Sequence, residues 1–153
     1  MPQLDRPEAE PPVSAHALEP FVHEEEVREY LDRYARAVTT GEPSAVASLW
    51  SVPAFVIDDR GARGLSTLAD VETFFAGSRE HYAGRGIVDT RPDIQKIEWL
   101  GDRIVLTDVR WPLFDRDHRE RGAERSAYTL ERNAAGELKM RVAVMRGEIS
   151  DGH

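Results

Sequence analysis

The sequence predicts an α+β fold in which three N-terminal helices pack on a curved antiparallel β-sheet and enclose a pocket. Two observations support it. Apolar residues recur at helical spacing up to about residue 84, and mostly at every second residue after Gly86. The later segments are joined by hairpin turns, and no βα unit repeats. At 153 residues the chain has the size of one domain, which we assign to residues 23–149.

The two ends of the chain differ in composition from this domain. Five of the nine prolines fall in the first 20 residues, among several glutamates. We therefore expect residues 1–22 to form a disordered acidic, proline-rich tail, and residues 150–153 a short C-terminal tail. The start lacks the basic segment and apolar run of a secretory signal, and no run of about 18 apolar residues could cross a membrane. We expect a cytoplasmic protein.

The first predicted helix spans residues 24–40, EEEVREYLDRYARAVTT. Its apolar side chains fall at spacings of 3, 4, 7, 8 and 11 and form one stripe: Val27, Tyr30, Leu31, Tyr34, Ala35 and Val38. Gly41 suits a left-handed helix end. Pro43 suits the first position of a short second helix, which ends before Pro53.

A small hairpin and a third helix follow. Residues 54–59 are typical of a short strand, and residues 63–65 of its return strand. Thr67 and Asp70 have the spacing of a capping pair. They predict a third helix over residues 68–84, which forms a second wall of the core.

Four further strands are predicted as a meander, over residues 94–100, 103–114, 125–132 and 138–146. Gly101-Asp102 supplies a two-residue hairpin turn, and NAAGE, residues 133–137, a longer one. Alternation predicts the faces that point to the helices: Val105, Val109, Trp111 and Leu113 on one strand, and Leu138, Met140, Val142 and Val144 on another.

The opposite sheet face is only partly polar. It carries Asp108 and Arg110, a pair that is typical of a surface salt bridge. It also carries Ile104, Leu106 and Phe114. A half-apolar outer face is commonly covered by a second subunit, so we predict a homodimer through this face.

Composition excludes several classes of function. The formal net charge is -8, and the basic residues do not cluster, so we expect neither nucleic acid nor an anionic membrane as a partner. The absence of cysteine excludes disulfides and a cysteine nucleophile. The five histidines lack zinc-site spacing, and no glycine-rich loop links a strand to a helix. We therefore expect no metal and no cofactor.

Residues 31–59, LDRYARAVTTGEPSAVASLWSVPAFVIDD, resemble the opening of the ketosteroid isomerase and SnoaL-like group of the NTF2-like superfamily. The shared features are an RY pair in the first helix, a glycine at its end, a short helix ending in Leu-aromatic, and an A-x-V-x-D strand. The resemblance covers roughly residues 25–85, and the last hairpin more loosely. It implies a cone-shaped fold around a pocket, a scaffold that serves unrelated activities.

The same resemblance implies a site. Asp58 falls where the isomerases keep the carboxylate that shuttles the proton, and Tyr34 where they keep the phenol that donates to the enolate oxygen. The position of their second acid falls near Tyr128. Removing a proton next to a carbonyl needs a base on one side of the substrate and donors at the oxygen. The resemblance thus implies a cofactor-free isomerase, cyclase or dehydratase with Asp58 as general base.

The residues predicted to line the pocket are apolar or aromatic: Trp50, Val56, Phe75, Val109 and Trp111. Such a lining favours a small, flat, apolar ligand that contains a carbonyl group. The same residue types are also typical of a solid core, and Asp58 lies in DDRG, a turn sequence. Two functions therefore stay open. One is a small-molecule-binding protein with enzymatic activity, and the other is a non-catalytic ligand-binding or dimeric interaction module.

Overall fold

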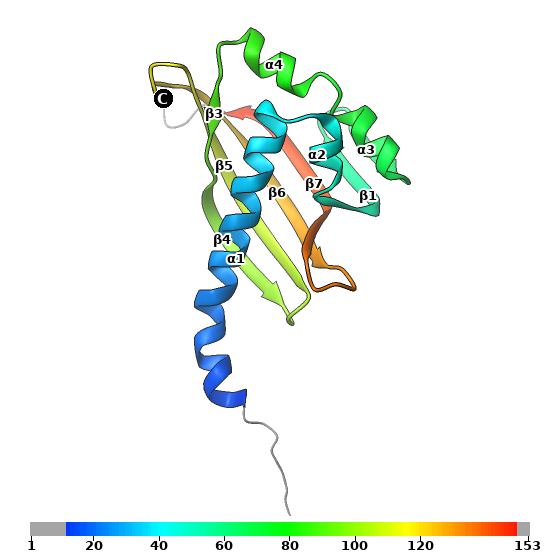
Figure 1. Cartoon of the computed structure of the whole chain (residues 1–153), viewed down its shortest axis with the longest axis vertical. Coiled ribbons are helices and arrows are strands. Elements are labelled where there is room, and N and C mark those ends of the chain that lie inside the picture. Colours follow the sequence, from blue (N-terminus) through cyan, green and yellow to red (C-terminus); the bar gives the residue numbers. More distant parts are fainter. Residues whose placement is uncertain (1–11, 150–153) are drawn as a thin grey trace, which may run out of the picture.

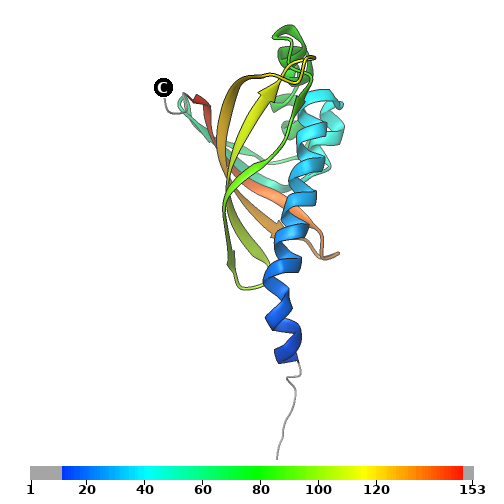
Figure 2. The same ribbon diagram turned by 90° about the vertical axis from the view of Figure 1, so that its left-hand side faces the viewer.

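A computed structural model describes residues 12–149 of the chain (Figure 1). The helices are α1 (Pro12–Thr40), α2 (Pro43–Ala47), α3 (Leu68–Phe74) and α4 (Ser78–Gly84). The strands are β1 (Trp50–Asp58), β2 (Gly61–Leu65), β3 (Asp89–Thr90), β4 (Asp93–Leu100), β5 (Ile104–Phe114), β6 (Glu120–Arg132) and β7 (Leu138–Ile149). Figure 2 shows α1 running along the concave side of the curved sheet.

Helix α1 begins earlier than the sequence predicts. It starts at Pro12, so residues 12–22, which we expected in the disordered tail, are helical. Proline suits the first helical position, and extending a formed helix adds one backbone hydrogen bond per residue without a new nucleation cost. The predicted tails over residues 1–11 and 150–153 lie outside the described residues.

The sheet has the strand order β2-β1-β7-β6-β5-β3, and β4 also pairs with β5. Strands β4 to β7 form the predicted antiparallel meander. β1 pairs with β7 in parallel, which the antiparallel prediction did not include. The connection from β1 and β2 to the rest of the sheet passes through α3 and α4, so the chain leaves one edge and returns at the other.

The predicted third helix is two helices. Thr67 and Asp70 form the expected capping box at the start of α3. The helix ends at Phe74, and Gly77 adopts a left-handed conformation with φ 88 before α4 begins. Because the break turns the chain, Phe75 is buried in the core, whereas α4 buries none of its residues.

A β-bulge changes the predicted inward face of β7. Leu138 and Met140 point to the helices as expected. Arg141 is then an extra residue opposite β6, because Thr129 pairs with Val142 while Leu130 pairs with Met140. The alternation therefore shifts by one residue, so Ala143 is fully buried in the core while Val142 and Val144 are only half-buried.

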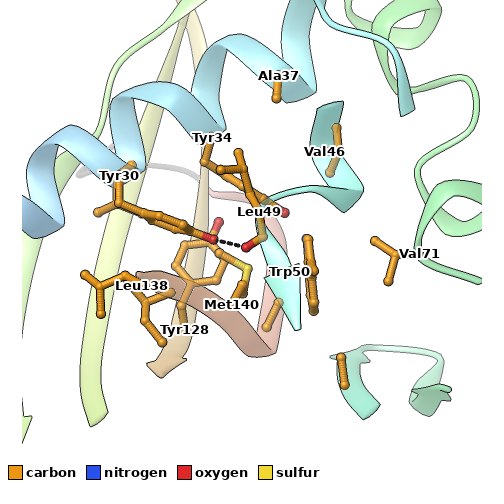
Figure 3. Close-up of a cluster of buried hydrophobic side chains, with 14 of the residues drawn as sticks. Tyr30, Tyr34, Ala37, Val46, Leu49, Trp50, Val71, Tyr128, Leu138 and Met140 are labelled. Carbon is orange, nitrogen blue, oxygen red and sulfur yellow. Dashed lines mark hydrogen bonds between the residues drawn. The ribbon is translucent and has the colours of Figure 1, made fainter. Parts of the chain in front are cut away.

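The core lies between α1 and the sheet, and it is anchored where β1 begins. The Tyr30 hydroxyl on α1 donates to the carbonyl of Leu49 at 2.5 Å (Figure 3). The same carbonyl accepts from the Met140 N–H at 2.9 Å. Trp50 belongs to β1 and not to the short second helix.

In the described part of the chain, no helix has the length and apolar content needed to cross a membrane.

Candidate functional site

A cavity of about 220 Å³ lies between α1, α4 and the sheet. Helix α1 contributes Tyr34, Ala35, Val38 and Thr39, and the strands contribute Trp111, Leu113, Ser126, Tyr128 and Met145. The cavity is also lined by Phe75, by the α4 residues Ser78, His81 and Tyr82, and by Glu124 of β6. Most of the lining is apolar, so the few polar groups decide what the cavity can recognise.

Tyr34 places a buried hydroxyl group on the cavity wall. Its side chain is 4% exposed, and its oxygen has no hydrogen-bond partner among the described residues. The indole N–H of Trp50 lies near this oxygen but outside hydrogen-bond geometry, and it is also unpartnered. Burial raises the pKa of Tyr34 well above its usual value, so the phenol stays protonated and can donate.

Tyr128 provides a second phenol on the same cavity wall. Its hydroxyl oxygen accepts a hydrogen bond from the indole N–H of Trp111 at 2.9 Å. Burial raises the pKa of Tyr128 to about 12, although its side-chain hydrogen bonds with Ser126 and Trp111 act to lower it. The rings of Tyr34 and Tyr128 meet edge to face, with centroids 5.9 Å apart. Because Tyr128 is the acceptor in its bond with Trp111, that bond does not use the Tyr128 proton, which can be donated to an oxygen in the cavity.

A carboxylate lies at the more exposed end of the cavity. Glu124 accepts a hydrogen bond from the Tyr82 hydroxyl at 2.7 Å, which ties α4 to β6. Next to it, Arg85 donates to Glu148 at 2.6 Å, and Glu148 is the cross-strand partner of Glu124. Burial raises the pKa of Tyr82, and the negative charge of Glu124 raises it further, so this phenol remains a donor. The cavity thus has phenols at its buried end and a carboxylate at its exposed end.

The structure corrects the placement of Asp58. Alternation along β1 puts it on the same side as Val56, but it is the last residue of the strand, where it pairs with Gly61 in the hairpin. Its carboxylate accepts from the backbone N–H of Arg60 at 2.9 Å and from the Arg60 guanidinium at 3.1 Å. These contacts lower the pKa of Asp58, whereas a base in a dry cavity has a raised one. Asp58 does not line the cavity.

The other predicted site residues separate into two groups. Phe75 and Trp111 line the cavity together with the two phenols. Trp50, Val56 and Val109 are buried in the packed core and do not line it. Strand alternation assigns Val56, Val109 and Trp111 to the inner side of the sheet, but it does not show where space remains between the helices and the sheet.

One family matches most of the chain: NTF2-like protein (DUF6841), over residues 24–148. The chain belongs to this NTF2-like family. The membership confirms the predicted superfamily and its cone fold. No curated protein matches the chain in sequence.

Solved structures agree with this NTF2-like fold. An NTF2-like protein with a cystatin-like fold from Novosphingobium aromaticivorans is 15% identical, with a TM-score of 0.65, over 95% of this chain and 94% of that one. A domain of unknown function from Nostoc punctiforme is 12% identical, with a TM-score of 0.63, over 85% and 80%. An NTF2-like superfamily protein from Salmonella enterica is 15% identical, with a TM-score of 0.60, over 87% and 96%. These likenesses show the fold alone.

Sequence reasoning missed Glu124 and Tyr82. The predicted strand begins at residue 125, whereas β6 begins at Glu120, so the prediction leaves Glu124 outside the strand. Glu124, Ser126 and Tyr128 are alternate residues of this strand, and that spacing was a usable signal. Tyr82 falls within the predicted third helix, residues 68–84, and the sequence gives it no role at a site. Among the described residues, no three His, Asp or Glu side chains gather as a set that could hold a metal ion.

Proposed function

We propose that this NTF2-like protein binds a small, flat, apolar molecule whose carbonyl oxygen accepts hydrogen bonds from Tyr34 and Tyr128. The observation that carries the proposal is the unpartnered, buried hydroxyl of Tyr34 on the cavity wall, close to the second phenol, Tyr128, which is the acceptor in its bond with Trp111. A buried donor without a partner costs about 1–3 kcal/mol, and a carbonyl oxygen from a ligand would recover that cost.

The size of the cavity limits the ligand. A dry protein cavity of about 150 Å³ holds benzene, and drug-sized ligands occupy pockets of roughly 300 Å³ or more. A volume of about 220 Å³ therefore suits one ring with short substituents rather than a steroid. The Asp58-dependent isomerase, cyclase or dehydratase reaction is not part of this proposal, because the Asp58 carboxylate caps a turn outside the cavity.

The proposal is tested with para-ethylacetophenone as the probe. We expect calorimetry to show binding to the wild-type protein and about tenfold weaker binding to Tyr128→Phe, because one hydrogen bond to the ketone is lost. Asp58→Asn serves as the control and should bind as the wild type does. Equal affinity of wild type and Tyr128→Phe would exclude the carbonyl contact, and no binding to the wild type would exclude the ligand class.

We also propose that a second copy of the chain covers the outer sheet face. Phe55 is 52% exposed and Ile57 is 38% exposed, although both lie on β1, which has β2 on one side and β7 on the other. Their partners on β7 are Val142 and Val144, the residues that the bulge directs away from the core. An exposed apolar patch on a sheet face is typical of a two-fold symmetric interface, because one patch can pack against its own copy.

The dimer is tested by light scattering coupled to gel filtration. We expect the wild-type protein to elute with the mass of two chains and Phe55→Glu with the mass of one, because a carboxylate would be buried at the interface. Val88→Glu is the control, since Val88 is also exposed and apolar but lies outside the sheet. A wild-type monomer, or a Phe55→Glu dimer, would contradict the proposal.

A further inference from the structure

The polar groups of the cavity differ in kind between its two ends. The buried end carries the hydroxyl donors Tyr34 and Tyr128. Toward the exposed end, Glu124 is half-buried and is the one carboxylate among the described residues that line the cavity. A ligand that meets an acceptor here must present a donor, whereas at the buried end it must present an acceptor.

Among the described residues, Glu124 has no ion-pair partner. Its hydrogen bond comes from the neutral phenol of Tyr82, while the neighbouring Glu148 is paired with Arg85. Within residues 23–148, no Lys, Arg or His side chain lies within ion-pair distance of Glu124. A half-buried carboxylate without a counterion attracts a cationic group more strongly than an exposed one does, because it is less screened by water.

We propose that the ligand of this cavity carries a protonated amine, which Glu124 binds at the exposed end while the phenols hold the carbonyl oxygen at the buried end. This inference rests on the proposed function. The ligand class is thus an aryl or alkyl ketone with a basic amine at its far end. Glu124 acts as a specificity-determining residue.

The spacing of the two ends agrees with such a molecule. Glu124 and Tyr128 are four residues apart on β6, with Ser126 between them on the same wall. A strand rises about 3.3 Å per residue, so their Cα atoms are about 13 Å apart. Both side chains line the cavity from the same face of β6. A benzene ring with a hydrogen-bonding substituent at each end, together with the two hydrogen bonds of about 2.8 Å, spans a separation of this order.

The test compares two probes of the same shape. para-(Aminomethyl)acetophenone is cationic at neutral pH, and para-ethylacetophenone is its neutral counterpart. We expect the wild-type protein to bind the amine about tenfold more tightly, because a charge-assisted hydrogen bond replaces a methyl contact. The preference should disappear in Glu124→Gln, which keeps an acceptor for Tyr82. It should persist in Glu72→Gln, which loses the same charge on the exposed side of α3.

The outcomes separate the two proposals. If the neutral ketone binds and the amine binds no more tightly, the role of Glu124 is overturned while the ketone site stands. If neither probe binds the wild-type protein, both proposals are overturned. A measurement on the wild type alone gives a second check, which does not depend on the folding of a variant. The advantage of the amine should fall as salt is added, and an advantage that salt leaves unchanged would exclude an ionic contact.

Discussion

Replacing Ala35 by phenylalanine is expected to abolish ketone binding while the protein remains folded. Ala35 is 4% exposed on α1 and lines the cavity. The added ring would occupy the space of about 220 Å³ that we assign to the ligand. Burial of one aromatic ring is worth about 2–3 kcal/mol, so its loss weakens binding by about 30- to 150-fold. Titration calorimetry with para-ethylacetophenone measures this loss.

Ala45→Phe is the matched control for this experiment. Ala45 is exposed on α2 and does not line the cavity, so the same added ring should leave the affinity unchanged. The thermal midpoint of Ala35→Phe distinguishes a filled cavity from a damaged core. A filled cavity keeps or raises the midpoint, because the ring gains contacts without displacing packed side chains. A folded Ala35→Phe protein that still binds the ketone would show that the ligand binds elsewhere.

Replacing Tyr30 by alanine is expected to lower the free energy of unfolding by about 3–5 kcal/mol. The Tyr30 ring is 1% exposed and belongs to the core cluster between α1 and the sheet. Domains of this kind have a total stability of about 5–15 kcal/mol, so the variant should be close to unfolding at ambient temperature. Urea denaturation followed by circular dichroism measures the change.

Tyr30→Phe separates packing from hydrogen bonding at this position. The Leu49 carbonyl would still accept from the Met140 N–H at 2.9 Å, so losing the hydroxyl should cost only about 1 kcal/mol. If the alanine and phenylalanine variants were equally destabilised, the hydrogen bond and not the ring would be the anchor. That result would contradict the packing argument.

Local patterns in the sequence predicted most of the elements. The stripe of α1 and the turns at Gly101 and Gly136 depend on residues that are close in the chain. The division of the third helix at Gly77 and the bulge at Arg141 were missed. Both depend on what lies opposite in space. Helix α4 lines the cavity with Ser78, His81 and Tyr82, and the register of β7 is fixed by its pairing with β6.

The candidate site was predicted less completely than the fold. Tyr34, Tyr128, Phe75 and Trp111 were named from the sequence and lie around the cavity, while Asp58 lies outside it. The strand pattern gives the side of the sheet on which a residue lies. It does not show whether the side chain lines the cavity or is packed in the core. The NTF2-like resemblance placed Asp58 by its position in a motif, and the hairpin turn then binds its carboxylate.

The sequence alone therefore determined the order of most helices and strands and the inner side of most strands, because periodicity of apolar residues is a local property. Only the tertiary structure decided where the layers separate into a cavity and which polar groups meet there. Tyr82 reaches Glu124 across 42 residues of chain, and Trp111 reaches Tyr128 across 17. Such contacts follow from the curvature and register of the sheet, which arise only when all strands are paired.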